Sequence, residues 1–167
     1  MAPAPRTVFR VVGLTGMLLR ALAHLLSPAG PSARLSVLIF HRVLAQPDPL
    51  FPSEPDARRF DAILGWISQW FCVMPLNTAV AALRRGELPG RALSITFDDG
   101  YADNHSVALP LLQRHGMTAT FFIASGFLDG GRMWNDSVIE AVRRTSLGTL
   151  NLRGLGMDEL EDRKSVV

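Results

Sequence analysis

The nine residues LSITFDDGY (93–101) are the most informative stretch of the chain, because an apolar run ends there in two carboxylates, a glycine and the only tyrosine. The run Leu93–Phe97 has the β-branched and aromatic content of a buried strand, and Gly100 limits it to strand length. Asp98 and Asp99 then lie where a strand of a parallel sheet leaves the core. Because α/β folds keep their functional sites at this edge, the stretch predicts an α/β fold with a site at the aspartate pair.

Asp98 and Asp99 are adjacent in the sequence, which constrains how they act together. Side chains alternate along a strand, so the two carboxylates serve one site only if the backbone turns between or just after them. Gly100 supplies that freedom. Two like charges this close oppose each other's ionisation, and a bound metal ion is one ordinary way to relieve the repulsion. An Asp-Asp-Gly sequence also occurs as a plain turn with solvated carboxylates, but the strand before it and the helix pattern after it favour a site.

Length and composition indicate one globular domain. The chain has 167 residues, 48% of them apolar and 19% charged, which excludes a disordered chain and allows a sizeable core. The formal net charge is only +2, and the basic residues are scattered rather than interleaved with aromatic ones. We therefore expect no nucleic-acid partner.

Cys72 is the only cysteine of the chain. A single cysteine excludes an internal disulfide bond and a metal cluster held by several thiolates. Because it lies in the short apolar run Phe71–Met74, an expected strand, we predict a buried and inert thiol rather than a nucleophile.

Residues 6–26 are apolar, with basic and small residues recurring at steps of four and three. This spacing aligns Arg6, Arg10, Arg20 and His24 and predicts an amphipathic helix with a basic stripe. Three interpretations of this helix are open: it packs against the core, it lies on an anionic membrane surface, or it belongs to a signal peptide. Because Arg20 fits a signal peptide poorly, packing or membrane-surface contact is favoured, and a cytoplasmic or membrane-peripheral location is favoured over secretion. No stretch is long and uncharged enough to span a bilayer.

A break rich in proline and glycine separates this helix from an apolar strand, Leu35–Phe40, which ends at His41. We therefore assign residues 1–34 to an N-terminal helix and linker and residues 35–167 to the main domain. A lone histidine at the end of a strand is usually a structural hydrogen-bonding residue. The position of His41 nevertheless matches that of the aspartate pair, so it is a second-rank candidate for the site.

Strands and helices alternate through the main domain. Besides the two strands above, we expect strands at Phe71–Met74 and, buried, at Met117–Ala124, and helices at Asp56–Trp70, Asn77–Arg85, from Asp103 or Asn104 to His115, and Trp134–Thr145. Asp56, Asn77, and Asp103 or Asn104 are the expected N-caps, and Gly116 is expected to end the third helix. This order calls for about four parallel strands joined by helical crossovers.

Short motifs occur in the chain in a fixed order: FHRV (40–43), TFDDGY (96–101), ALPLL (108–112) and ATFFI (119–123). Together they resemble the polysaccharide deacetylases with a NodB-like domain, over roughly residues 35 to 141. The resemblance implies a distorted, incomplete (β/α) barrel, in agreement with the order of elements. It also implies a substrate class, since members of the family remove N-acetyl groups from amino sugars in chitin-like, peptidoglycan or exopolysaccharide chains.

By that resemblance Asp98 corresponds to the general base, and Asp99 corresponds to a carboxylate ligand of a divalent metal, usually zinc. In the family a metal-bound water, activated by the base, attacks the acetamide carbonyl. The backbone N–H that helps to hold the oxyanion would here belong to Tyr101. His41 remains a neighbouring candidate.

The family's other two metal ligands are histidines in a later His-Ser/Thr-x-x-His motif, and the chain has no such pair. His105 and His115, which follow Asp99, are ten residues apart and lie in a different element. The family's arginine motif and its late histidine, the general acid, are missing too. Because a catalytic zinc needs three protein ligands, we expect the N-terminal part of a deacetylase domain that is inactive, or nearly so, alone. Four strands also cannot close a barrel, so the last parallel edge would be exposed and prone to self-association.

Two other functions stay open. A non-catalytic module of this fold would bind a glycan or a partner through the exposed sheet edge or the basic N-terminal helix. A phosphotransferase with Asp98 as nucleophile fits less well, because that chemistry usually needs Asp-x-Asp spacing and a downstream lysine. The only lysine, Lys164, lies in the irregular C-terminal stretch.

Overall fold

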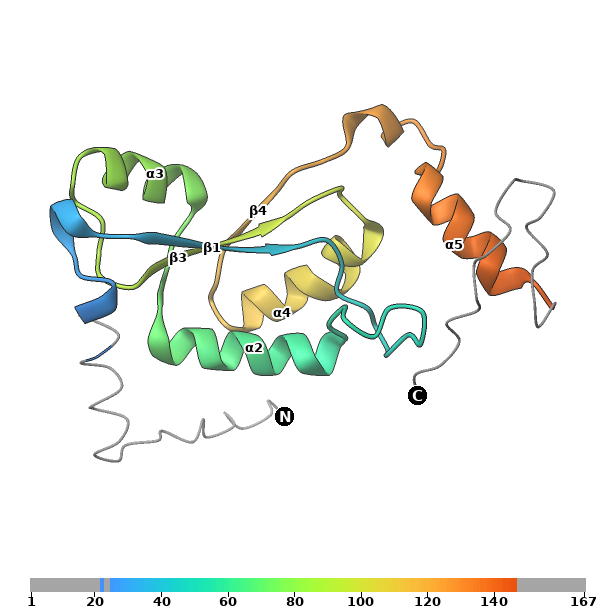
Figure 1. Cartoon of the computed structure of the whole chain (residues 1–167), viewed down its shortest axis with the longest axis horizontal. Coiled ribbons are helices and arrows are strands. Elements are labelled where there is room, and N and C mark those ends of the chain that lie inside the picture. Colours follow the sequence, from blue (N-terminus) through green and yellow to red (C-terminus); the bar gives the residue numbers. More distant parts are fainter. Residues whose placement is uncertain (1–21, 23–24, 147–167) are drawn as a thin grey trace, which may run out of the picture. The chain divides into compact units, whose positions relative to one another are not determined.

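The computed structural model of the 167-residue chain describes residue 22 and residues 25–146. The chain divides into two compact units, Met1–Ala124 and Ser125–Val167, and each is described by itself. The first unit contains a parallel sheet with helices packed against it, as Figure 1 shows. The second contains a 3-10 turn and one helix.

The predicted amphipathic helix at residues 6–26 lies outside the described residues except near its end. There Leu22, Leu25 and Leu26 are helical and exposed to solvent. In the part of the chain that the structure describes, no helix has both the length and the apolar character needed to cross a membrane. Membrane-surface contact through this segment stays a prediction.

Strands and helices alternate as the sequence predicts. In chain order the first unit has a 3-10 turn (Gly30–Ser32), β1 (Leu35–Phe40), α2 (Ala57–Trp70), β2 (Cys72–Val73), α3 (Leu76–Arg84), β3 (Ala92–Phe97), a π-helical segment (Asn104–Ala108), α4 (Leu109–Arg114) and β4 (Ala119–Phe121). The second unit has a 3-10 turn (Ser125–Phe127) and α5 (Trp134–Arg144).

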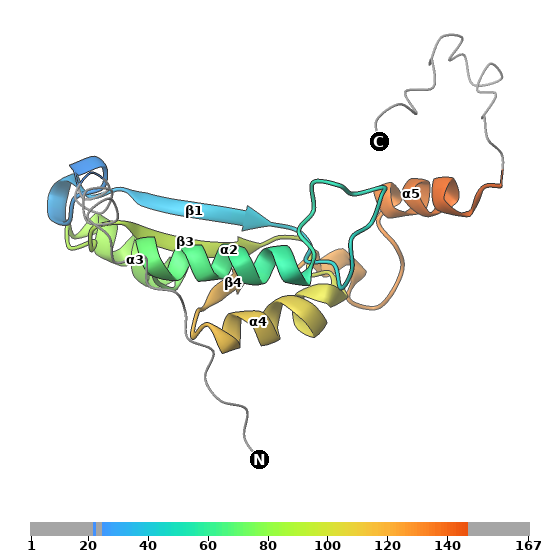
Figure 2. The same cartoon turned by 90° about the horizontal axis from the view of Figure 1, so that it is seen from below.

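The central strand of the four-stranded sheet is β3, and each of the other strands pairs with it in parallel. β1 follows it along one side, from Leu35 opposite Ala92 to Phe40 opposite Phe97. On the other side β2 pairs with the beginning of β3 and β4 with its end. Figure 2 shows β1, β3 and β4 in one open layer. The predicted α/β class with about four parallel strands in an unclosed sheet is confirmed.

A rung of three phenylalanines crosses the sheet just before the aspartate pair. Phe40, Phe97 and Phe121 occupy equivalent positions on β1, β3 and β4. The ring of Phe97 stacks on those of Phe40 and Phe121, with centroids 5.4 and 5.0 Å away, and Phe60 of α2 meets it edge-on at 5.9 Å. Such pairs add about 0.5–1.5 kcal/mol each beyond the burial of their area. The rung therefore makes the end of β3 the best anchored part of the core.

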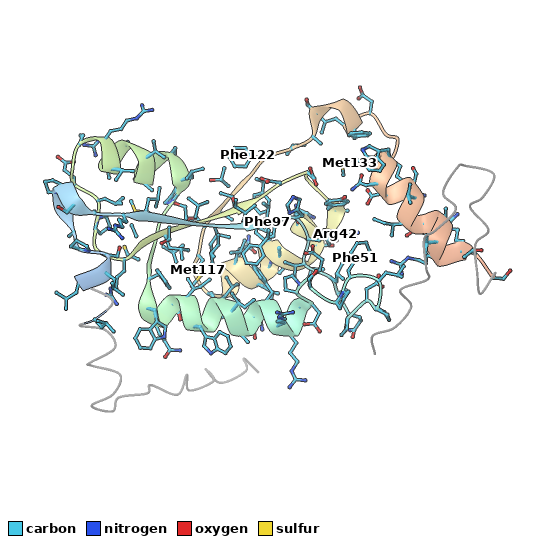
Figure 3. The ribbon with its side chains drawn as sticks, viewed as in Figure 1. Arg42, Phe51, Phe97, Met117, Phe122 and Met133 are labelled. Atoms are coloured by element: carbon cyan, nitrogen blue, oxygen red, sulfur yellow. The ribbon has the colours of Figure 1, made fainter. Side chains whose placement is uncertain are left out.

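The opposite face of the sheet is only partly covered. At its N-terminal end α3 contributes to a small second core that includes Ala79, Leu88 and Ala92. Toward the C-terminal end the side chains of Ile39 and Phe122 are exposed, and Figure 3 shows Phe122 on the side of the sheet away from α2. Among the described strands β1 is an edge strand, because it pairs only with β3. Self-association through an open edge stays a prediction.

Two predictions about burial are wrong. Cys72 is exposed, because β2 is a strand of two residues at the margin of the sheet. The strand expected at 117–124 is shorter and less buried, since it pairs with β3 only over Ala119–Phe121 and leaves Phe122 and Ile123 exposed. Both errors arise because burial depends on neighbouring strands that local sequence does not reveal.

The helix ends are confirmed only in part. The Oδ1 of Asp56 accepts a hydrogen bond from the N–H of Arg59 at 2.7 Å, as an N-cap should. Gly116 follows α4 with a φ of +62°, as predicted. The cap at Asn77 is wrong, because α3 begins at Leu76. The cap predicted at Asp103 or Asn104 is also wrong, because Asp103 makes no capping hydrogen bond and Asn104 lies within the π-helical segment. A cap for the fourth expected helix at Asn135 or Asp136, which the sequence also allows, is wrong because α5 already begins at Trp134.

We expect Phe97→Ala to lower the free energy of unfolding by about 3–5 kcal/mol, because the truncation leaves a cavity in the phenylalanine rung. The matched control Phe122→Ala removes the same atoms from a side chain that is 51% exposed, so it should cost only about 1 kcal/mol. Urea unfolding of the intact chain, followed by circular dichroism, measures both. Equal costs would contradict the assignment of Phe97 to the centre of the core.

Candidate active site

The aspartate pair lies directly beyond the phenylalanine rung, at the C-terminal end of β3. The N–H of Asp98 donates to the carbonyl of Phe40 at 2.9 Å, which extends the ladder between β1 and β3 by one residue. Because Phe97 faces the core, alternation directs Asp98 to the opposite face of the sheet. Asp98 and Asp99 are both half-buried. The first carboxylate is thus placed by regular strand pairing.

Asp99 forms the corner of a very tight turn. The N–H of Gly100 donates to the carbonyl of Asp98 at 2.9 Å, and Asp99 has a φ of +70°. This combination is a γ-turn of the rare, strained form. Among the described residues other than glycine, only Arg91 also has a positive φ. The backbone therefore turns at Asp99 itself, which lets adjacent carboxylates serve one site.

Backbone strain of this kind costs about 1–3 kcal/mol and persists only where the surroundings hold it. The chain beyond β4 provides part of that support, since the N–H of Ala124 donates to the carbonyl of Asp99 at 3.4 Å. Gly100 has a φ of +71°, and a Cβ added there would lie 3.1 Å from the Cγ2 of Ile123. The turn is therefore packed on one side by the exit from β4.

Arg42 joins the end of β1 to the residues that follow the turn, a role that sequence reasoning missed. Its Nε donates a hydrogen bond to the Oδ2 of Asp103 at 2.8 Å, and its Nη2 forms an ion pair with the same oxygen at 2.8 Å. The guanidinium carbon lies 4.6 Å from the centroid of the Tyr101 ring, a cation–π contact. Figure 3 labels Arg42 near this end of the sheet. Its place beside His41 in the FHRV motif was the available signal.

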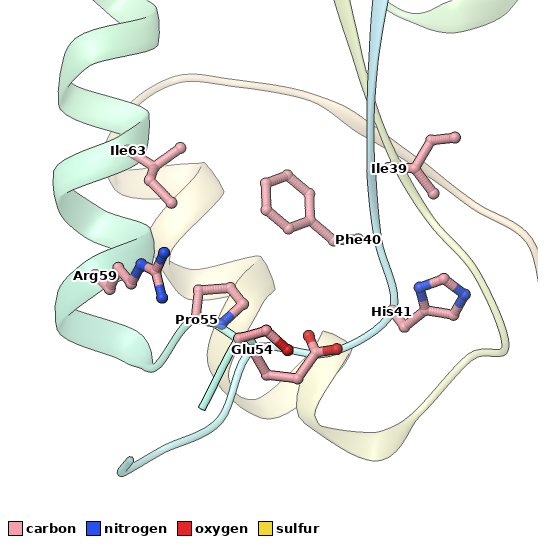
Figure 4. A pocket seen from close by; sticks show the side chains of 8 residues that line it. Ile39, Phe40, His41, Glu54, Pro55, Arg59 and Ile63 are labelled. Carbon is pink, nitrogen blue, oxygen red and sulfur yellow. The ribbon is translucent and has the colours of Figure 1, made fainter. Parts of the chain in front are cut away.

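His41 is exposed and leaves β1 at the level of Asp98, because the ladder pairs Phe40 with Phe97. Figure 4 shows the His41 ring on the side of β1 away from α2, whereas Phe40 points toward Ile63. Between β1 and the start of α2 runs an open groove of about 310 Å³ that also includes Glu54. The four predicted site residues thus lie at one edge of the sheet: Asp98 and Asp99 in the turn, Tyr101 directly after it, and His41 at the neighbouring strand end.

Asn104 is buried beneath this edge, only 4% exposed, at the start of the π-helical segment. Its N–H donates to the carbonyl of Tyr101 at 2.9 Å. Its side-chain amide has no hydrogen-bond partner among the described residues. The N–H of Leu109 donates to the carbonyl of Asn104, which is the wider spacing of a π-helix. Pro110, the second residue of α4, has no N–H of its own. Short π-helical segments are frequent at functional sites.

The side chains gathered here do not complete a metal centre. In residues 22 and 25–146, no three or more His, Cys, Asp and Glu side chains are arranged to hold a metal ion. Asp99 offers one carboxylate, whereas a catalytic zinc needs three protein ligands. His105 is exposed, and the Nε2 of His115 contacts the Oδ1 of Asp61 at 2.8 Å after the end of α4. The described residues therefore fit only part of such a centre.

The carboxylates in the strained turn after the central strand lie at the edge where α/β folds place their functional sites, and comparison with known proteins points to one family. Residues 85–145 match the model of the polysaccharide deacetylase family. A Bacillus subtilis (strain 168) protein, YxkH, that is named for the same family is 30% identical over 93 residues, which are 54% of this chain and 32% of that protein.

Solved structures show the same fold. A de-N-acetylase from Aggregatibacter actinomycetemcomitans is 24% identical with a TM-score of 0.52, covering 65% of this chain and 50% of that one. IcaB from Ammonifex degensii is 26% identical with a TM-score of 0.50, covering 70% and 50%. The Streptococcus pyogenes deacetylase PplD is 20% identical with a TM-score of 0.51, covering 65% and 52%.

Over residues 85–145 this chain is therefore similar to part of a polysaccharide deacetylase domain, and its sheet shares the fold of solved deacetylases. The chain spans about a third of the curated relative and about half of each solved chain. The matched residues include the whole turn that carries the aspartate pair.

We expect Gly100→Ala to destabilise the chain more than Gly116→Ala. Both glycines have a positive φ, so alanine should cost about 1 kcal/mol at either position. At Gly100 the new methyl group also meets Ile123 at 3.1 Å, whereas nothing lies within 4 Å at Gly116. The added overlap should raise the cost at Gly100 by about 1–3 kcal/mol. Urea unfolding of both variants tests this, and equal losses would contradict a turn packed against Ile123.

Proposed function

We propose that this chain supplies the general base and one metal ligand of an enzyme that removes N-acetyl groups from amino-sugar polysaccharides. Asp98 is the base, Asp99 is a ligand of a divalent metal such as zinc, and the backbone N–H of Tyr101 donates to the oxyanion. The observation that carries the proposal is the strained γ-turn, which presents both carboxylates at the end of β3 inside the matched region.

Asp98 is suited to the role of base by its position. Hydrolysis of an acetamide requires a water that loses a proton as its oxygen attacks the carbonyl carbon. The hydrogen bond from its own N–H to Phe40 fixes the backbone of Asp98. Its carboxylate, on the face of the sheet away from the core, accepts that proton.

The developing oxyanion and the departing amine need partners as well. A backbone N–H held in place stabilises the oxyanion without reorganising, and Tyr101 follows the turn with its ring against Arg42. The amine takes up a proton as the C–N bond breaks. His41 leaves β1 level with Asp98, and the ring N–H of an imidazole is a hydrogen-bond donor. We assign His41 as the neighbour that supplies it.

Polysaccharide deacetylases are generally metal-dependent, and Asp99 alone does not make a metal centre. We propose that the remaining ligands are not in this chain, which has no His-Ser/Thr-x-x-His pair, so that the chain by itself is inactive or nearly so. The strain at Asp99 supports a role in a metal centre. In a plain turn with solvated carboxylates, a residue without positive φ would serve as well and would avoid the cost of the strain.

The purified chain, incubated with zinc and a chito-oligosaccharide, should release acetate no faster than zinc alone, because a single carboxylate holds the metal too weakly. An enzyme-coupled acetate assay measures this. Asp129→Asn, at an exposed position in the second unit, is the control for loss of a carboxylate. Acetate release that falls on Asp98→Asn but not on Asp129→Asn would overturn the proposed inactivity and show a complete centre.

Asp99→Gly should leave the free energy of unfolding unchanged or raise it by about 1 kcal/mol, because glycine adopts a φ near +70° without a Cβ penalty. The matched variant Asp98→Gly should lower it by about 1 kcal/mol, since Asp98 belongs to the ladder and has no positive φ. Urea unfolding compares the two. If Asp99→Gly costs as much as Asp98→Gly, the aspartate is not held under strain for function.

A further inference from the structure

Arg42 makes the one side-chain ion pair that the structure shows between the end of β1 and the segment after the turn. Its partner Asp103 is 61 residues away in the sequence. The two side chains are 31% and 12% exposed, so the pair is partly shielded from water. The hydrogen bond from Nε is charge-assisted, and such bonds are stronger than neutral ones; the Nη2 group adds an ion-pair contact to the same oxygen. The contact therefore restrains both segments.

The Arg42–Asp103 contact lies next to the peptide between Gly100 and Tyr101, which carries the Tyr101 N–H. Gly100 is packed against Ile123, where an added Cβ would make a tight contact of 3.1 Å. The ring of Tyr101 lies under Arg42, and the carbonyl of Tyr101 accepts from the N–H of Asn104. The peptide between Gly100 and Tyr101 thus has contacts at both ends, and Arg42 supplies one of them.

The same contact also helps to hold the backbone of His41, because both neighbours of His41 make hydrogen bonds. The carbonyl of Phe40, just before it, accepts from the N–H of Asp98. The side chain of Arg42, just after it, binds Asp103. The backbone of His41 therefore has a fixed place relative to Asp98, although the residue itself is exposed.

We propose that Arg42 is a positioning residue of the deacetylase centre, which sets the Tyr101 N–H and His41 around the aspartate pair. The guanidinium group does this through Asp103 and the Tyr101 ring without touching substrate. The role in catalysis rests on the proposed function, whereas the restraint on the turn does not. Lysine is a poor substitute, because it lacks the planar group that donates two N–H bonds and stacks on a ring.

Amide hydrogen exchange of the intact ¹⁵N-labelled chain tests the restraint. In the wild type, local opening of this segment must break the charge-assisted pair, and in Arg42→Ala it need not. The amides of Gly100 and Asn104 should therefore exchange about tenfold faster in the variant. The amides of Ile95 and Leu112, in β3 and α4, should keep their rates. Arg42→Lys should recover part of the protection.

The matched control is Arg85→Ala, which breaks an exposed pair with Glu87 and should leave all these rates unchanged. Unchanged exchange at Gly100 and Asn104 in Arg42→Ala overturns the proposal. Equal acceleration at Ile95 and Leu112 also overturns it, because Arg42 would then serve only global stability.

A zinc titration followed at the amides of Asp99 and Gly100 tests the link to the centre. Arg42→Ala should weaken zinc binding by about threefold or more, since a looser turn presents Asp99 less often in the right place, while Arg85→Ala should not. Equal zinc affinities in the wild type and Arg42→Ala overturn the positioning role. If zinc leaves the wild-type amides unshifted, the metal role of Asp99 fails instead, and the exchange result alone decides whether Arg42 restrains the turn.

Discussion

The parallel pairing of β1 with β3 is the constraint on which the rest of the structure depends. β3 is buried along its whole length, and every other strand of the sheet pairs with it. The register that sets Phe40 opposite Phe97 also sets the level at which the chain leaves the sheet. A slip of one residue would turn every side chain of β1 to the other face. The same pairing that builds the aromatic core therefore brings His41 level with Asp98.

The site shows how a stable core supports a strained element. Before the γ-turn, the phenylalanine rung and the hydrogen bond from Asp98 to Phe40 hold the strand. After it, Ile123 packs closely against Gly100. Arg42, which follows β1, binds Asp103 in the segment after the turn. Restraint from several directions offsets the cost of a positive φ at Asp99 and keeps two repelling carboxylates in a fixed arrangement.

Much of the fold was predictable because its signals are local. The apolar run before Asp98, the N-cap at Asp56 and the glycine after α4 each depend on a few neighbouring residues, and the structure confirms them. What failed depends on distant partners. Cys72 is exposed because its strand is short and marginal. Asp103 has a helix-capping sequence but binds Arg42, 61 residues earlier. Arg42 itself was missed, because its role exists only once β1 and β3 are paired.

The central claim is that the aspartate pair is part of a metal-linked deacetylase centre and not a turn on a glycan-binding module. Isothermal titration of the intact chain with a chito-oligosaccharide, with and without zinc, tests it most directly. If Asp99 holds a metal that contacts the sugar, zinc must tighten glycan binding, and by linkage glycan must tighten zinc binding. At zinc concentrations high enough to load the single carboxylate of Asp99, we predict this mutual effect in the wild type and its loss in Asp99→Asn. Glycan binding that is the same with and without zinc would contradict the account.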